Sequence, residues 1–181
     1  MDHDALLASL QQAIPGVAFE TAPSIDRQAT VYVEARALHD VALALRDHSD
    51  LAFAFLAELT AADFWPREPR FELIYVLVSF THKNRLRLKV RLNGNDAHIA
   101  TVTDLWPAAN WLEREVWDMF GVVFDGHPDP RRLLMPEDWE GYPLRKDYPV
   151  QIRKGANYVE PLQVTEEEFR RNLEKDRLSR R

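Results

Sequence analysis

Two adjacent segments with different hydrophobic patterns constrain the fold more than any other feature of this sequence. Residues 71–80, FELIYVLVSF, are apolar at almost every position, as in a strand with both faces covered. The polar segment THKN then leads into RLRLKVRL, which alternates strictly between apolar and cationic residues. Two such runs joined by a short turn predict a β-hairpin.

The alternation in the second strand places its cations together on one face of the sheet. These cations are Arg85, Arg87, Lys89 and Arg91. We interpret them as a solvated face whose charges meet acids on neighbouring strands and discourage edge pairing. Binding of nucleic acid is the alternative. The net charge of -6 and the lack of interleaved aromatic residues on that face argue against it.

The rest of the chain predicts an α+β fold: a small mixed or antiparallel sheet with packed helices, followed by an extended C-terminal segment. Residues 3–13 predict a short helix, residues 29–35 a strand and residues 37–48 a second helix. Residues 51–64 predict mainly a strand, because phenylalanine recurs at alternate positions. We divide the chain into an α+β domain, residues 1–125, and a proline-rich connector with a C-terminal tail, residues 126–181.

The composition excludes several kinds of chemistry. The chain has no cysteine, which rules out disulfides, cysteine-ligated Fe–S clusters, Cys-type zinc sites and thiol nucleophiles. No apolar run approaches the ~20 residues of a membrane helix. The acidic segment MDHDALLASL is unlike a signal or transit peptide. We expect a soluble chain that acts where it is made, with any electrons carried by another protein.

A third helix is predicted over residues 107–120, where Pro107 suits the first turn and Gly121 the position after the end. Its core stripe should consist of Ala108, Ala109, Leu112, Val116, Met119 and Phe120. The side chains that face away are Trp111, Arg114, Trp117 and Asp118. They contact either a partner protein or this chain's own C-terminal segment.

The charged residues of this helix lack the geometry of a reaction centre. Glu113 and Glu115 lie ~200° apart on a helix, so they cannot work as an acid–base pair. Arg114 and Asp118 are one turn apart, and ion pairing is the simpler explanation for them.

A metal site is the alternative reading of the residues that follow the helix. Asp125, His127 and Asp129 occupy alternate positions and could serve a metal-dependent hydrolase. One histidine between two acids falls short of a recognisable zinc or calcium site, and the adjacent prolines indicate a rigid loop. The sequence has no P-loop, dinucleotide-binding motif or nucleophile elbow.

Proline becomes frequent between Pro128 and Pro149, where apolar and aromatic residues interleave with cations. A stiff ribbon with arginine and aromatic side chains suits binding to a protein. Beyond it, Thr165 and Glu168 are spaced as a capping box and predict a final helix. Ordering this tail costs roughly 1–2 kcal/mol per residue, so we expect it to become ordered on a partner.

Several of these segments resemble one known family. EREVWDMFG and the residues after it resemble the signature of the C subunit, the 30 kDa subunit family, of proton-pumping NADH:quinone oxidoreductase, respiratory complex I. The similarity extends to LTAAD (59–63), VTDLWPAANW (102–111) and GYPLRKDYP (141–149). The signature residues are Glu113, Arg114, Glu115, Asp118, Met119, Phe120, His127, Arg131, Leu133 and Leu134.

The resemblance implies a non-catalytic subunit of the peripheral arm, which braces the quinone-site (D) subunit and the Fe–S electron path from NADH to quinone, coupled to proton translocation. It implies no cofactor and no catalytic, cofactor-binding or metal site on this chain, with FMN, Fe–S clusters and quinone on other subunits. It implies a peripheral place on the cytoplasmic side of the bacterial inner membrane, with membrane contact only through the complex and no nucleic acid. The equivalent subunit of a related ferredoxin- or hydrogenase-linked membrane complex is the alternative.

The resemblance also implies that the connector lies along neighbouring subunits. The expected interface residues are Trp117, Arg131, Arg132, Leu134, Tyr142, Leu144, Arg145 and Tyr148. We expect the substitution Arg145→Glu to weaken assembly but to leave the isolated domain folded, since a surface cation contributes little to folding.

Overall fold

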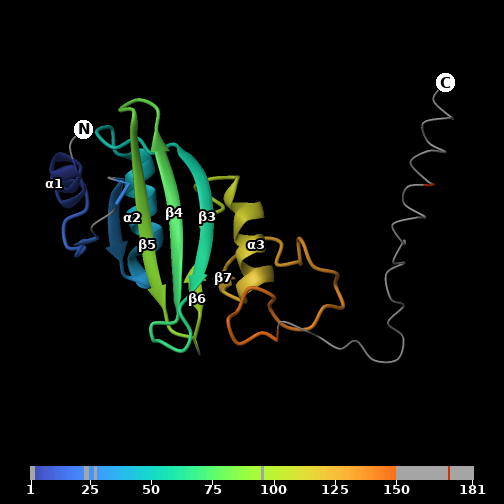
Figure 1. The fold of residues 1–181 in the computed structure, drawn as a ribbon. Helices are drawn as coiled ribbons and strands as arrows, with labels where there is room; N and C mark the ends of the chain where they lie inside the picture. The colour runs from blue at the N-terminus through green and yellow to red at the C-terminus, as the bar shows by residue number, and fades with distance from the viewer. Residues whose placement is uncertain (1–2, 23–24, 27, 95, 150–170, 172–181) are drawn as a thin grey trace, which may run out of the picture. The chain divides into compact units, whose positions relative to one another are not determined.

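A five-stranded mixed sheet lies at the centre of the computed structural model (Figure 1). Its strands, in spatial order, are β1 (Glu20–Thr21), β2 (Ala29–Val33), β5 (Asn84–Leu92), β4 (Phe71–Ser79) and β3 (Phe55–Asp63). β2 runs parallel to β5, and the other neighbours are antiparallel. The predicted α+β fold and the β4–β5 hairpin are confirmed.

Three helices and a smaller sheet complete the described structure. The helices are α1 (His3–Ala13), α2 (Leu38–Asp47) and α3 (Ala109–Phe120), with a 3-10 turn, η1 (Ala35–Ala37), before α2. β6 (His98–Ala100) and β7 (Val123–Asp125) pair in parallel. α2 lies behind the main sheet in Figure 1, and α3 lies beside β3. The four predicted helix and strand positions before the hairpin agree with this arrangement, although the strand expected over 51–64 begins only at Phe55.

The structure describes residues 3–22, 25–26, 28–94, 96–149 and 171. Met1–Tyr148 form one compact unit, so residues 126–148 of the connector pack with the sheet domain. The final helix predicted from Thr165 and Glu168 lies outside the described residues. None of the helices in the described part is both long enough and apolar enough to cross a membrane.

The two faces of the hairpin differ as the alternation predicts. Leu73, Tyr75 and Leu77 of β4 and Leu86, Leu88 and Val90 of β5 are buried on the inner face. On the outer face, three of the cations meet acids: Arg87 pairs with Asp26, Lys89 with Glu72 and Arg91 with Glu20, at N–O distances between 2.7 and 2.9 Å. The interpretation of this face as cations balanced by nearby acids is confirmed at these positions. The expectation that the charges discourage edge pairing is wrong, because β5 is the central strand and is paired on both sides.

Candidate functional site

Asp118 on α3 anchors the connector through a nest of hydrogen bonds. One carboxylate oxygen accepts the backbone N–H groups of Leu133, Leu134 and Met135, at distances between 2.8 and 3.0 Å. The other oxygen accepts Nη1 of Arg132 at 2.6 Å. Burial alone would raise the pKa of Asp118, but these hydrogen bonds lower it below the ordinary value. The buried carboxylate therefore stays ionised and fixes the path of the connector.

Arg114 fixes the preceding part of the connector. Its Nε donates to the backbone carbonyl of Arg131 and its Nη2 to that of Arg132, both at 3.0 Å. Nη1 lies 3.4 Å from a carboxylate oxygen of Asp129. The guanidinium also lies over the ring of Trp111, 5.2 Å from its centroid. The planar donor group thus binds a specific bend of the backbone, which a lysine could not reproduce.

This face of α3 was expected to contact either a partner protein or this chain's own C-terminal segment, and the second alternative is confirmed for Arg114, Trp117 and Asp118. Arg114 and Asp118 are buried beneath this chain's own connector, and Trp117 is half-buried there. Arg114 and Asp118 take part in ion pairs, but not with each other: Asp118 pairs with Arg132, and Arg114 lies 3.4 Å from Asp129. Trp111 is 58% exposed. The core stripe is confirmed except at Ala108, which is exposed because α3 begins one residue later.

Glu113 has a different task on the same helix. Its carboxyl group accepts the backbone N–H of Val102 at 2.8 Å and bonds to the hydroxyl of Thr101. The side chain is completely buried, and this burial raises the pKa of Glu113 to about 7, while the bonds from Thr101 and Val102 oppose the rise only in part. Glu113 thus ties the loop before α3 to the helix. Glu115 is exposed, so the two acids do not form a pair.

The three residues of the alternative metal site, Asp125, His127 and Asp129, do not converge. His127 directs Nε2 to the carbonyl of Asn110 at 3.1 Å and receives the N–H of Asp129 on Nδ1 at 3.0 Å. Asp129 pairs with Arg131, and Asp125 lies 3.1 Å from His98. Within the described ranges, no group of three His, Asp or Glu side chains is placed to hold a metal ion. The hydrolase alternative therefore lacks its ligand set.

The end of α3 binds a later part of the connector. Nε of Arg145 donates to the carbonyl of Phe120, and the guanidinium lies over the ring of Tyr142, 4.4 Å from its centroid. Gly121 ends the helix with a φ of 73°, and a Cβ added there would lie 2.4 Å from a ring carbon of Tyr142. The glycine is therefore required by its conformation and by this close approach. The expectation that Arg145 is a free surface cation is wrong.

Arg70 joins the connector to the main sheet. It forms bidentate pairs with Asp63 at the end of β3 and with Asp147 of the connector, at distances between 2.7 and 3.0 Å. Burial alone would raise the pKa of Asp63, but the bonds from Arg70, the N–H of Lys146 and the N–H of Trp65 lower it to about 2. Sequence reasoning missed this cluster, because its members lie far apart in the chain and follow no local period.

The predicted interface residues divide into two groups. Five of them contact other groups of this chain: Trp117, Arg132, Tyr142, Arg145 and Tyr148. Arg131, Leu134 and Leu144 point outward, the two leucines being 61% and 51% exposed. Large apolar side chains on the surface are typical of protein interfaces. The interface assignment itself stays a prediction.

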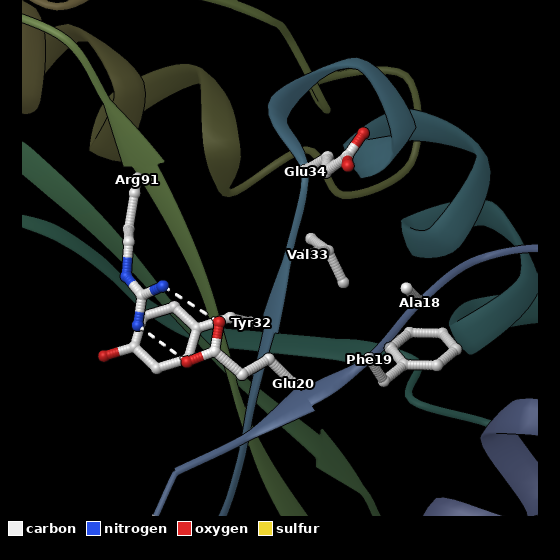
Figure 2. A pocket seen from close by; sticks show the side chains of 7 residues that line it. All are labelled: Ala18, Phe19, Glu20, Tyr32, Val33, Glu34 and Arg91. Carbon is white, nitrogen blue, oxygen red and sulfur yellow. Dashed lines mark hydrogen bonds and ion pairs between the residues drawn. The ribbon is translucent and has the colours of Figure 1, made fainter. Parts of the chain in front are cut away.

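A separate hollow of about 350 Å³ lies beside β1 and β2 (Figure 2). Arg91 at its edge bonds to both carboxylate oxygens of Glu20 and lies 3.7 Å from the ring centroid of Tyr32. These contacts already neutralise the guanidinium, so the hollow offers little to an anionic ligand.

Comparison with known proteins agrees with the arrangement of α3 and the connector. The family described as "Respiratory-chain NADH dehydrogenase, 30 Kd subunit" matches residues 31–154. The chain belongs to this family. The residues that bind the connector, from Arg70 to Asp147, all lie in the matched region.

Individual relatives are also similar over most of the chain. The C subunit of NADH-quinone oxidoreductase from Roseiflexus sp. (strain RS-1) is 45% identical over 86% of this chain and 89% of its own length. The combined C/D subunit of NADH-quinone oxidoreductase from Nitrosospira multiformis is 43% identical over 76% of this chain and 23% of its own length.

Two solved structures have a similar fold. The trypsin-resistant fragment of Nqo5 is 32% identical, with a TM-score of 0.57, covering 71% of this chain and 99% of the fragment. A chain of the archaeal membrane-bound sulfane sulfur reductase has a TM-score of 0.70 over 90% of this chain and 98% of its own length. At 24% identity, the second likeness concerns the fold alone.

Proposed function

We propose that this chain is the C subunit of a respiratory NADH:quinone oxidoreductase, complex I, and a non-catalytic part of its peripheral arm. One observation carries the proposal: the charged residues of the family-like signature hold the chain's own backbone. Asp118 and Arg114 bind the connector, and Glu113 binds the loop before α3. A catalytic acid or base would need to reach a substrate, whereas these groups are buried and bonded.

The cofactors of the reaction are placed on other subunits in this proposal. A chain without cysteine cannot ligate an Fe–S cluster with thiolates. FMN, the Fe–S clusters and the quinone would then belong to neighbouring chains, and this subunit would brace the electron path from NADH to quinone, with proton translocation coupled to it elsewhere. The whole assembly would hold the chain peripherally on the cytoplasmic side of a bacterial inner membrane.

The quinone-site (D) subunit is the proposed main partner. The Nitrosospira relative is named as a combined C/D subunit, which supports a close association of the two. The connector would present Arg131, Leu134 and Leu144 to this partner, and α3 would present the exposed ring of Trp111. The internal bonds of Asp118 and Arg145 would fix the connector before it docks, which reduces the entropy lost on binding.

The proposal is tested by purification from native membranes through a tag at the N-terminus of this chain. We expect equal amounts of a quinone-site subunit and of Fe–S subunits, together with NADH-dependent quinone reduction. Subunits for another electron donor would instead identify a ferredoxin- or hydrogenase-linked complex. A chain that purifies alone and folded from these membranes would contradict the proposal.

A further inference from the structure

The outer face of the main sheet carries a column of apolar side chains. This column consists of Ile74, Val76 and Val78 at alternate positions of β4, and all three are half-buried. α2 lies behind the sheet in Figure 1. The cations of β5 flank this column on one side. β3 lies on the other side, in a register that pairs Phe55 with Val78.

The charges on this face are balanced at every cation but one. Arg87, Lys89 and Arg91 each pair with an acid of this chain. Arg85 is exposed, and in the part of the chain that the structure describes it has no ion pair. Although the chain has a net charge of -6, none of its described acids pairs with Arg85, whereas acids balance the three neighbouring cations.

Exposed aromatic rings lie in the same row as this cation. The register of the sheet aligns Phe55, Val78 and Arg85 across β3, β4 and β5. The rings of Phe55 and Phe80 lie 5.6 Å apart between centroids, and the two side chains are 45% and 69% exposed. Aromatic residues beside an arginine are the composition typical of binding hot spots between proteins.

We propose that Phe55, Phe80 and Arg85 form a docking surface for a partner protein segment that presents a carboxylate between apolar side chains. The carboxylate would pair with the guanidinium of Arg85, and the apolar side chains would cover the two rings. Glu58 is exposed in the next row of the face, so an extended phosphate backbone would meet repulsion there.

This surface is distinct from the connector. Phe55 and Val78 lie at one end of the β3–β4 pair, whereas Asp63 and Phe71 lie at the other end. Asp63 is also where Arg70 ties the connector to the sheet. The inference rests on the proposed function only in that the chain works inside a complex, and it adds a second contact to that complex.

The substitution Arg85→Lys tests the carboxylate directly. The purified complex, tagged on this chain, is treated with a carbodiimide, which joins an amine to a carboxylate in direct contact but leaves guanidinium groups unmodified. We expect a cross-link from the introduced lysine to an Asp or Glu of another subunit. The matched control is Arg36→Lys, at an exposed cation that pairs with Glu34 of this chain, where we expect a link within the chain.

A second variant tests coverage of the rings. Because the chain has no cysteine, Phe80→Cys introduces its single thiol, and Arg36→Cys provides the exposed control. We expect maleimide to label the first variant at least ~10-fold more slowly than the second in the intact complex, and equally fast after denaturation.

The outcomes separate this inference from the proposed function. Equal labelling of the two thiols, or a link from position 85 only to this chain or to a second copy of it, would overturn the docking surface. Purification of the chain without any other subunit would instead overturn the proposed function before the cross-linking begins.

Discussion

The β4–β5 hairpin and the connector are stabilised in opposite ways. The hairpin combines a continuous backbone ladder with a buried apolar face, so its stability is shared among many equivalent contacts. The described part of the connector, residues 126–148, has little regular structure and depends on a few buried charges, chiefly Asp118, Arg114 and Arg70. A segment with little secondary structure can thus be positioned firmly, but each of its anchors is hard to replace.

The substitution Asp118→Asn should have the largest effect, because it leaves Arg132 and a nest of N–H groups without their anion. Removing one partner of a buried ion pair costs roughly 3–5 kcal/mol. We expect the connector to detach while the sheet stays folded. Limited trypsin digestion should then cleave after Arg131 or Arg132 at least ~10-fold faster, with the sheet signal in circular dichroism preserved. A variant that loses the sheet signal in circular dichroism together with its resistance to trypsin would contradict this local role.

The substitution Leu88→Ala should act on the molecule as a whole. Leu88 is buried at the centre of the inner face of the sheet, and truncation of such a leucine costs roughly 2–5 kcal/mol. We expect the midpoint of urea unfolding to fall for the sheet and the connector together. A variant that releases the connector first would show that the two regions are less different than we describe.

The pH dependence of stability should reveal Glu113. Its pKa is about 7 in the folded chain and 4.5 when unperturbed, so the folded state holds the proton more tightly than the unfolded state. Stability is therefore highest below about 4.5 as far as this group is concerned, and falls as the pH rises through about 7. The loss should approach about 3 kcal/mol.

The control for this effect is Glu113→Gln, whose amide resembles the protonated acid. It can accept the N–H of Val102 and donate to Thr101. Urea unfolding between pH 5 and 8 should show falling stability for the wild-type chain and a flatter profile for the variant. Asp63 and Asp118, whose pKa values are lowered, destabilise the fold only at more acidic pH. Parallel profiles would refute the assignment.

The smallest predicted effect distinguishes two adjacent arginines. Arg132 has a side chain that is 14% exposed and pairs with Asp118, whereas the side chain of Arg131 is 73% exposed and pairs with Asp129. We expect Arg132→Ala to cost roughly 1–3 kcal/mol and Arg131→Ala less than about 1 kcal/mol. Thermal unfolding of the two variants measures the difference. Equal losses would mean that the Asp118 nest does not depend on Arg132.

The sequence was informative where the chemistry is local. Alternation over the eight residues 85–92 predicts β5, and Pro107 and Gly121 predict the extent of α3. The partners of the buried charges were not predictable in the same way, because Arg70 and Asp147 are 77 residues apart and no period links them. The same holds for Arg145, which the sequence predicts to be a surface cation: nothing near it in the sequence indicates that it binds the end of α3.

The residues of α3 show the same difference between what is local in the sequence and what depends on the tertiary fold. The segment from Glu113 to Phe120 resembles a family signature, but its spacing alone does not identify the partners of Arg114 and Asp118. Their actual partners are mostly backbone groups of the connector, whose positions depend on the tertiary fold. An acid and an arginine one turn apart on a helix can form either a surface ion pair or a buried anchor. Burial distinguishes the two cases, and the sequence alone does not show that Asp118 is buried.

We propose that α3 positions the connector for assembly and takes no part in the chemistry. The most direct test compares Asp118→Asn with the control Glu115→Gln, which changes an exposed acid on the same helix. The amount of assembled complex and its rate of quinone reduction are measured in membranes from cells that express each tagged variant. We predict that Asp118→Asn lowers the amount of assembled complex, while each complex that forms reduces quinone at the wild-type rate, and that the control changes neither. A normal amount of assembled complex with little quinone reduction would contradict the account and assign Asp118 to the reaction itself.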